Sequence, residues 1–229
     1  MEWAEWEPTW LQIRTDFGFS AAEDLDAARI LHAMVPASSR FRALGIQLRN
    51  RSDIVVVGCG PSLEKAPAAL FGDQTVVAAD GAVERLRELG ILPQVLVTDL
   101  DGEPEALKWA ADAGSIPVVH AHGDNREELR SLAPSLGPLL HGTHQVGPEN
   151  PLEPLRNLGG FTDGDRAVVM CEALGARSVR LVGFDFDAGP SRYSHRWDPA
   201  TKPRKLRWAE RIIRDVHARG RTRVEQWVP

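Results

Sequence analysis

The stretch VLVTDLDGEP, residues 95–104, decides the fold class of this chain. Its first four residues, Val95–Thr98, are strand formers, and a nearly continuous apolar run is typical of a parallel strand that helices cover on both faces. Asp99 and Asp101 follow at once, and residues two apart in an extended chain point to the same side. Carboxylates held this close raise each other's pKa unless a cation lies between them. The stretch therefore predicts a buried parallel strand that ends at a cation site.

Apolar runs of this kind alternate with amphipathic segments from about Asp53 to the C-terminus. The predicted strands are Ile54–Val57, Thr75–Ala79, Val95–Thr98, Ile116–His120, Pro138–His141, Val179–Gly183 and Arg223–Trp227. The predicted helices are Ser62–Leu70, Ala82–Leu89, Glu103–Ala113, Arg126–Leu132, Asp163–Leu174 and Lys202–Arg219. This alternation predicts an α/β fold with a Rossmann-like, largely parallel sheet and helices on both faces. Such sheets bind ligands outside the carboxyl ends of their strands.

Residues 1–50 have a different pattern, with two helical segments, Ala21–Met34 and Ser38–Leu48, and no convincing strand. We therefore predict an N-terminal helical appendage at 1–50 and an α/β catalytic domain at 51–229. The appendage also carries three tryptophans at helical spacing: Trp3, Trp6 and Trp10. They form either an aromatic wall over a ligand or a stripe that packs the appendage onto the core.

The composition is that of an ordinary globular protein, with 229 residues, 43% hydrophobic and 26% charged. The net charge of −5 disfavours a general nucleic-acid binder. No apolar run approaches the roughly 20 residues of a membrane span. The acidic start MEWAEWEPTW is unlike a signal peptide. The two cysteines are too few for a disulfide framework. We expect a cytoplasmic protein that binds neither nucleic acid nor membranes; a homo-oligomer is possible.

A glycine-containing turn, GCGPSL at 58–63, follows the first predicted strand. Gly58 and Gly60 would let the backbone approach a phosphate, and Ser62 after Pro61 would cap a helix whose N-terminal N–H groups attract anions. The turn lacks the third glycine of the dinucleotide fingerprint and the GK[ST] ending of a P-loop. A phosphate contact and a plain strand–helix turn therefore both stay open.

Acidic residues end the second and third predicted strands. Asp80, before Gly81, can receive a ribose hydroxyl or cap the next helix. Asp99 and Asp101 fit a hard divalent cation, which takes oxygen ligands and keeps substrate phosphates as well. A capping acid followed by a loop acid is the simpler alternative, but it explains only one of the two. We therefore predict a Mg²⁺ site at Asp99 and Asp101.

The fourth predicted strand ends in HAHGDN at 120–125. His120 and His122, two residues apart, could suggest zinc, but no cysteine lies near and the other ligands would have to be carboxylates. Zinc is therefore the weaker interpretation. Asp124 is either a third Mg²⁺ ligand or the cap of the next helix.

The remaining strands also end in polar residues. Thr143 lies at the end of the fifth strand, Thr162 is the predicted N-cap of a helix that begins at Asp163, and the sixth strand ends at Asp185 and Asp187. We expect Asp185 to face the ligand and Asp187 to lie in the loop. Because the ends of parallel strands meet at one edge of a sheet, this series predicts one site for a phosphorylated ligand carried with a metal.

The order of these motifs resembles the archaeal 6-hydroxymethyl-7,8-dihydropterin diphosphokinase family. The motifs are GCGPSL, ADGA, P-x-VLVTDLDG, HAHGDN, GTHQ, GGFTDGDRAV and LVGFDF, with KPRKL after them, and they cover about Asp53 to Ala218. DGA followed by DLD is also similar to thiamin diphosphokinase, in which the matching acids hold Mg²⁺. That enzyme's C-terminal β-sandwich has no counterpart in this chain.

The resemblance implies Mg²⁺-dependent transfer of diphosphate from ATP to the hydroxymethyl group of a reduced pterin, 6-hydroxymethyl-7,8-dihydropterin, with release of AMP. The product would serve tetrahydromethanopterin or folate biosynthesis. The implied catalytic residues are Asp99, Asp101 and Asp124, of which Asp99 and Asp101 hold the metal. The implied substrate-binding residues are Gly58, Gly60, Pro61, Ser62, Asp80, Gly81, His122, Asn125, Thr143, Thr162, Asp163, Asp185, Lys202 and Lys205. We expect Asp185 to contact the pterin; the two lysines either reach phosphates or form a solvated helix start.

Other functions stay open. A metal-dependent nucleotide-sugar glycosyltransferase would show the same Asp-x-Asp, and a thiamin diphosphokinase-like enzyme would share the acids. A catalytically silent nucleotide- or pterin-binding protein could use the same fold. A methyltransferase is the weakest alternative, because VVVGCGPS only loosely matches a cofactor-binding glycine loop. Product analysis distinguishes them.

Overall fold

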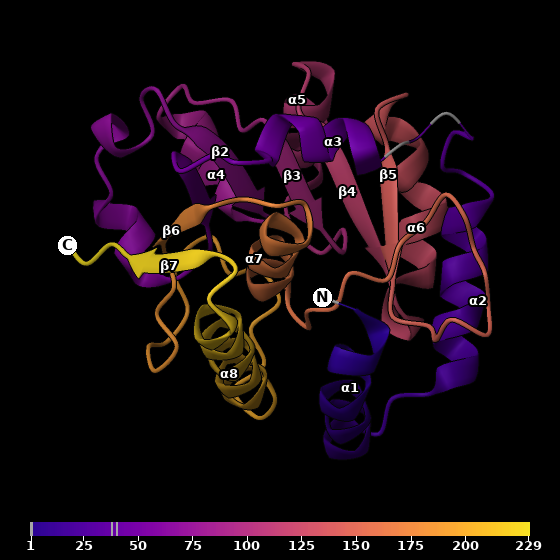
Figure 1. Ribbon diagram of the computed structural model, residues 1–229. Coiled ribbons are helices and arrows are strands. Elements are labelled where there is room, and N and C mark those ends of the chain that lie inside the picture. The colour runs from indigo at the N-terminus through magenta and orange to yellow at the C-terminus, as the bar shows by residue number, and fades with distance from the viewer. Residues whose placement is uncertain (1, 38, 40) are drawn as a thin grey trace.

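The computed structural model describes residues 2–37, 39 and 41–229 (Figure 1). In this part of the chain, seven parallel strands form one sheet in the order β5-β4-β3-β2-β1-β6-β7. The strands are β1 (Ile54–Val57), β2 (Thr75–Ala79), β3 (Val95–Thr98), β4 (Ile116–Ala121), β5 (His141–His144), β6 (Ser178–Val182) and β7 (Arg223–Gln226). The predicted α/β fold with a parallel sheet is confirmed.

The order in which the chain adds strands to the sheet reverses at β1. The chain adds β2, β3, β4 and β5 one after another on one side of β1 and then returns to place β6 on the other side. Val57, the last residue of β1, pairs with Ala78 of β2 and Val182 of β6. In open α/β sheets the crevice at such a switch point is where ligands bind.

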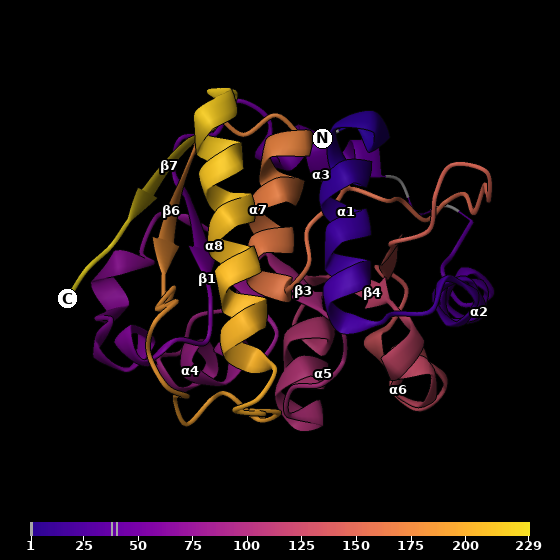
Figure 2. The same ribbon diagram turned by 90° about the horizontal axis from the view of Figure 1, so that it is seen from below.

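Helices cover both faces of the sheet. One face packs against α2 (Ala21–His32), α4 (Ala82–Glu88), α5 (Pro104–Asp112) and α6 (Arg126–Ser131). The other face packs against α1 (Trp3–Phe17), α3 (Phe41–Leu48), α7 (Asp163–Ala173) and α8 (Lys202–Arg219), and Figure 2 shows α1, α7 and α8 on the same side. None of the described helices is long and apolar enough to cross a membrane.

Strand β1 is apolar at every position because both of its faces are buried. Val55 and Val57 pack in the core beneath α2 and α4, whereas Ile54 and Val56 pack in the core beneath α7 and α8. Successive side chains of a strand point to opposite faces, so a strand that is covered twice needs apolar residues at every position.

The N-terminal helices belong to both cores. Trp6 and Trp10 are 2% and 3% exposed and stack with ring centroids 6.5 Å apart, which confirms that the tryptophan stripe packs against the core. The α2 helix lies on the opposite face. Of the predicted helix Ser38–Leu48, Ser38 lies outside the described residues, and α3 begins at Phe41. The division into an appendage and a catalytic domain stays a prediction.

The helix predicted at Ser62–Leu70 is wrong. The structure has one 3-10 turn at Pro61–Lys65 and another at Ala68–Leu70. Ala66 and Pro67 between them are extended, because the residue before a proline is pushed out of the helical region.

The fifth strand also differs from the prediction of Pro138–His141, because β5 spans His141–His144. Its side chains are mostly polar yet buried: Thr143 Oγ1 lies 3.0 Å from His120 Nδ1 of β4, and the two histidines bond to backbone groups next to the strand. An apolar pattern cannot reveal a strand of this kind.

Candidate active site

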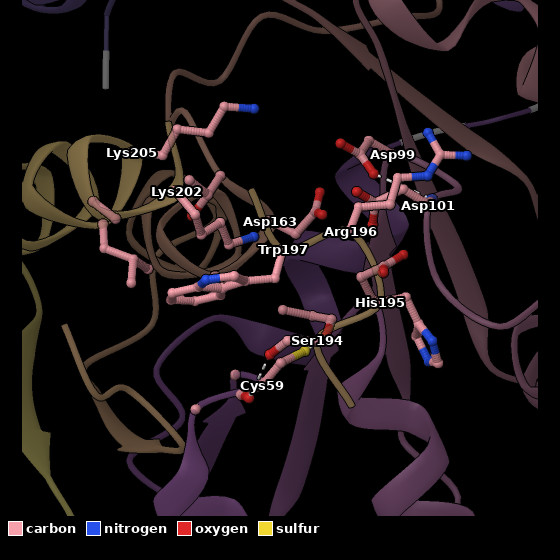
Figure 3. A pocket seen from close by; sticks show the side chains of 18 of the residues that line it. Cys59, Asp99, Asp101, Asp163, Ser194, His195, Arg196, Trp197, Lys202 and Lys205 are labelled. Carbon is pink, nitrogen blue, oxygen red and sulfur yellow. Dashed lines mark hydrogen bonds between the residues drawn. The ribbon is translucent and has the colours of Figure 1, made fainter. Parts of the chain in front are cut away.

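A cavity of about 360 Å³ lies at the carboxyl ends of β1, β2, β3 and β6, next to the start of α8 (Figure 3). Its walls include most of the residues that the sequence predicted for the site. These are Gly58, Gly60, Asp80, Asp99, Asp101, His122, Asp124, Asn125, Thr162, Asp163, Asp185, Lys202 and Lys205. The cavity therefore lies where the switch point beside β1 predicts a ligand.

Four other predicted residues do not line this cavity: Pro61, Ser62, Gly81 and Thr143. Thr143 is 1% exposed and lies inside β5, where it bonds to His120. Ser62 is not the expected N-cap, because Gly60 precedes the 3-10 turn. Gly81 packs closely against the backbone of Tyr193, a residue that lines the cavity: a Cβ at Gly81 would lie 2.3 Å from the Tyr193 carbonyl oxygen.

Asp185 fastens the glycine turn to the end of β6. Its Oδ2 accepts hydrogen bonds from the Ser62 amide at 2.8 Å and from the Ser62 hydroxyl at 2.7 Å. A Cβ on Gly60 would lie 2.3 Å from the same oxygen, so only glycine fits. Asp185 thus holds the turn that faces the cavity, and its contact with a pterin stays a prediction.

Four carboxylates gather at the floor of the cavity: Asp80, Asp99, Asp101 and Asp163. Each offers one oxygen, and these oxygens all lie within 4.8 Å of one another. Asp80 follows β2, Asp99 and Asp101 follow β3, and Asp163 begins α7. The cluster joins the two predicted metal ligands to two residues that the sequence assigned to substrate binding.

Two strained residues bring these carboxylates together. Asp80 has φ 41° and Leu100 has φ 72°, values that non-glycine residues rarely adopt. Thr98 fixes the position of both residues, because its hydroxyl donates a hydrogen bond to Asp80 Oδ1 and accepts one from the Leu100 amide at 2.8 Å. Such strain is found at functional sites, where the surrounding structure maintains it.

The predicted cap of α7 is confirmed and explains the position of Asp163. Thr162 precedes the helix, and Asp165 accepts from the Thr162 amide and hydroxyl, each at 2.8 Å. Because Asp165 satisfies the cap, the neighbouring Asp163 carboxylate is left to join the cluster.

The electrostatics of the cluster favour a bound cation. Burial raises the pKa of Asp80 well above its usual value, and the charges of Asp101 and Asp99 raise it further. Burial and the same neighbours raise the pKa of Asp163. Carboxylates that resist ionising together fit a hard divalent cation such as Mg²⁺, which takes oxygen ligands.

Asp99 is the exception within the cluster. Burial would raise its pKa, but a 3.2 Å hydrogen bond with His122 Nε2 and the charge of that ring outweigh burial and lower the pKa to about 2. Asn125 holds the backbone at the same place, because its Nδ2 donates to the Asp99 carbonyl at 2.8 Å. His122 and Asn125 therefore position Asp99.

Asp124 lies apart from the cluster. Its carboxylate is largely exposed and lies 3.9 Å from His122 Nδ1. Among the described residues, the metal-binding group contains no histidine, which disfavours the zinc interpretation. His120 is buried between Thr143 and Gln145.

Sequence reasoning missed the loop at 193–198, which forms one wall of the cavity. Figure 3 shows Trp197 and Arg196 from this loop beside the cluster, with Lys202 and Lys205 of α8 extending toward it. The loop is anchored by Ser191, whose hydroxyl donates to the Cys59 carbonyl at 2.6 Å. A loop without hydrophobic periodicity carries no local signal of its position.

A second cavity, of about 290 Å³, adjoins the first. It lies between the α1–α2 junction and the ends of β4 and β5. Six residues line both cavities: Asp99, His122, Asp124, Phe161, Asp163 and Lys205. Two members of the acidic cluster, Asp99 and Asp163, therefore stand where the two cavities meet.

Comparison with known proteins agrees with this geometry. A family model described as "6-hydroxymethylpterin diphosphokinase MptE-like" matches residues 31–190. The 6-hydroxymethyl-7,8-dihydropterin pyrophosphokinase of Pyrococcus furiosus is 38% identical over 98% of this chain and 98% of its own length. The chain belongs to this MptE-like family. A protein of the same name from Methanothermobacter thermautotrophicus is 39% identical over 99% of this chain and 100% of its own.

A third MptE-like relative, from Methanocaldococcus jannaschii, is 34% identical over 85% of this chain and 84% of its own length. The segment matched by the MptE-like model contains the whole acidic cluster but not the α1–α2 junction or α8. A probable thiamine pyrophosphokinase from Staphylococcus saprophyticus superposes with a TM-score of 0.37 at 16% identity, over 76% of this chain and 64% of that one. That likeness is too weak to bear on function.

Proposed function

We propose that this chain transfers a diphosphoryl group from ATP to the hydroxymethyl group of 6-hydroxymethyl-7,8-dihydropterin in a Mg²⁺-dependent reaction that releases AMP. The names of its relatives support the acceptor. The observation that carries the proposal is the acidic cluster at the junction of two cavities, because a transfer reaction needs two substrates to meet at one point. A cytoplasmic location and a role in tetrahydromethanopterin or folate biosynthesis stay proposals.

The first cavity suits the nucleotide. Gly58 and Gly60 present backbone at the switch point of the sheet, where nothing larger than hydrogen fits on their Cα atoms. Lys202 supplies a positive charge from α8, and Trp197 supplies an aromatic surface of the kind that stacks on a base. We assign the ATP phosphates to the glycine turn and Lys202.

The cluster suits the metal. Asp80, Asp99, Asp101 and Asp163 would hold Mg²⁺, which when bound neutralises charge on the phosphate oxygens. His122 and Asn125 keep Asp99 in place for this purpose.

The transfer itself is a displacement at the β-phosphorus. The pterin hydroxymethyl oxygen forms a bond to that phosphorus, the bond to the oxygen bridging the α- and β-phosphates breaks, and AMP leaves with the bonding electrons. The hydroxyl proton needs an acceptor. Asp124 lines both cavities and stands outside the cluster, so we assign it this role.

The test is a reaction of purified protein with ATP, Mg²⁺ and 6-hydroxymethyl-7,8-dihydropterin, analysed by mass spectrometry. The proposal predicts AMP and the pterin diphosphate in equal amounts, and no AMP without the pterin. ADP with a pterin monophosphate would overturn it. So would activity confined to thiamin or to a sugar nucleotide, or saturable binding without turnover.

A further inference from the structure

The second cavity has an aromatic wall. Phe17 and Phe19 stack with ring centroids 5.5 Å apart and planes inclined by 8°, and Phe161 packs against Phe17 at 5.2 Å. Phe17 ends α1, Phe19 lies in the link to α2, and Phe161 precedes α7. Three rings from two distant parts of the chain thus line the cavity beside the acidic cluster. Two cations border them: the Arg204 guanidinium lies 4.7 Å from the Phe17 ring centroid, and the Lys205 ammonium lies 5.9 Å from that of Phe161. A flat, conjugated ligand fits the aromatic wall better than a phosphate chain does.

A buried carboxylate belongs to the same cavity. Asp24 of α2 is 4% exposed, and its Oδ1 accepts from the Gly123 amide at 2.9 Å and from Gln145 Nε2 at 2.8 Å. Its Oδ2 makes no hydrogen bond within the described residues. Asp24 lines the cavity, so this second oxygen is free to accept a hydrogen bond from a ligand there.

A buried cation lies on the wall of the same cavity. Arg166 is 4% exposed, and its Nη2 donates to the Phe161 carbonyl at 3.0 Å. Its Nε has no hydrogen-bond partner. Asp24 and Arg166 thus leave one acceptor and one donor unsatisfied within the described residues that surround this cavity.

These features match one of the two proposed substrates. A pterin ring is flat, and its amino group and neighbouring ring N–H point the same way, so they can donate together to one carboxylate. The hydroxymethyl substituent lies at the opposite end of the ring. With the donor edge at Asp24, that substituent would point along the cavity toward Asp99 and Asp163, which line it as well.

We infer that the second cavity binds the pterin ring of the acceptor, with Asp24 accepting hydrogen bonds from the amino and N–H groups and with Phe17, Phe19 and Phe161 packing against the ring. This inference rests on the proposed function. It assigns recognition of the pterin substrate to Asp24 rather than to Asp185, whose Oδ2 accepts hydrogen bonds from Ser62. The N-terminal segment then supplies substrate specificity.

The experiment compares Asp24→Asn with the parent protein. Pterin fluorescence measures binding of 6-hydroxymethyl-7,8-dihydropterin, and calorimetry measures binding of Mg²⁺-ATP. We expect Asp24→Asn to weaken pterin binding about tenfold or more, because an amide nitrogen replaces an acceptor, and to change ATP binding less than twofold. Asp26→Asn is the matched control: it removes the same charge from an exposed position of α2 and should change neither ligand.

A second variant guards against misfolding. Phe19→Trp enlarges a half-buried ring in the wall and should weaken pterin binding at an unchanged melting temperature, without loss of ATP binding.

The outcomes separate the two proposals. If the parent converts the pterin but both variants bind it normally, the pocket assignment is wrong and the activity stands. Equal loss of both ligands in folded Asp24→Asn would also overturn the assignment. A parent that neither binds nor converts the pterin would overturn the activity and the assignment together.

Discussion

Asp185 and Ser62 are 123 positions apart in the sequence, yet one carboxylate oxygen of Asp185 accepts hydrogen bonds from both the amide and the hydroxyl of Ser62. This contact joins the carboxyl end of β6 to the turn after β1, the two places that border the switch point of the sheet. The shape of the proposed phosphate-binding turn therefore depends on a residue that is distant in sequence but adjacent in the sheet.

Removal of this contact should affect the nucleotide first. Asp185→Ala leaves two donors of Ser62 without a partner, and hydrogen bonds to a charged group are worth about 1.5–3 kcal/mol each. We expect the dissociation constant of Mg²⁺-ATP to rise about tenfold while pterin binding changes little, as measured by calorimetry and fluorescence. Asp187→Ala, an exposed position of the same loop, is the control. A selective loss of pterin binding would instead return Asp185 to the acceptor site.

Gly60 should tolerate no side chain. A Cβ at this position would lie 2.3 Å from Asp185 Oδ2 and 2.8 Å from the Gly183 carbonyl oxygen. We expect Gly60→Ala to lower the free energy of unfolding by about 1–3 kcal/mol in denaturant titrations, as overpacking does. Gly189→Ala, where nothing lies within 4 Å, should be neutral. Equal stability of the two variants would contradict this account of the turn.

The strand residues could be predicted from sequence because burial on both faces leaves an apolar run, as in β1 and β3. Asp99 and Asp101 could be predicted because they follow such a run directly. β5 could not, because its residues are mostly polar and Thr143 is buried only through a partner 23 positions away, His120.

The rest of the candidate site depends on contacts between distant segments. The sequence did single out Asp163, but nothing local shows that it meets Asp80 and Asp99 in one cluster. Asp24 looks like an ordinary helix residue until α2 packs beside Gly123 and Gln145. Tertiary packing alone makes it a buried acceptor.

Acid should destabilise the fold through His144. Burial lowers the pKa of His144 to about 4, whereas histidine in an unfolded chain titrates near pH 6.5. Above pH 6.5 both states are neutral and the stability is fully present; as the pH falls toward 4 only the unfolded state takes up the proton, so stability is lost. In His144→Asn the side-chain oxygen can still accept a hydrogen bond from the Val146 amide, but the asparagine side chain takes up no proton in this pH range.

We therefore expect the loss of unfolding free energy between pH 7 and pH 4.5 to be about 2 kcal/mol smaller in His144→Asn than in the parent. Denaturant titrations at the two pH values measure it. Identical pH dependence in the two proteins would show that His144 does not titrate as its burial requires.

The central claim is that the acidic cluster holds a divalent cation for diphosphoryl transfer. In Asp99→Asn and Asp101→Asn the shape is kept but a full charge leaves the cluster, so turnover should fall by orders of magnitude. Asp101→Asn should not impair folding, because it relieves repulsion among the carboxylates, whereas Asp99→Asn also weakens the contact with His122. Asp73→Asn, exposed and outside the cluster, is the control.

The most direct measurement is the melting temperature of the parent and both variants with and without Mg²⁺, paired with turnover. A ligand that binds only the native state stabilises it, so Mg²⁺ should raise the melting temperature of the parent and raise that of the variants far less. The variants should also be inactive. Active variants whose melting temperature responds to Mg²⁺ as the parent's does would contradict the account.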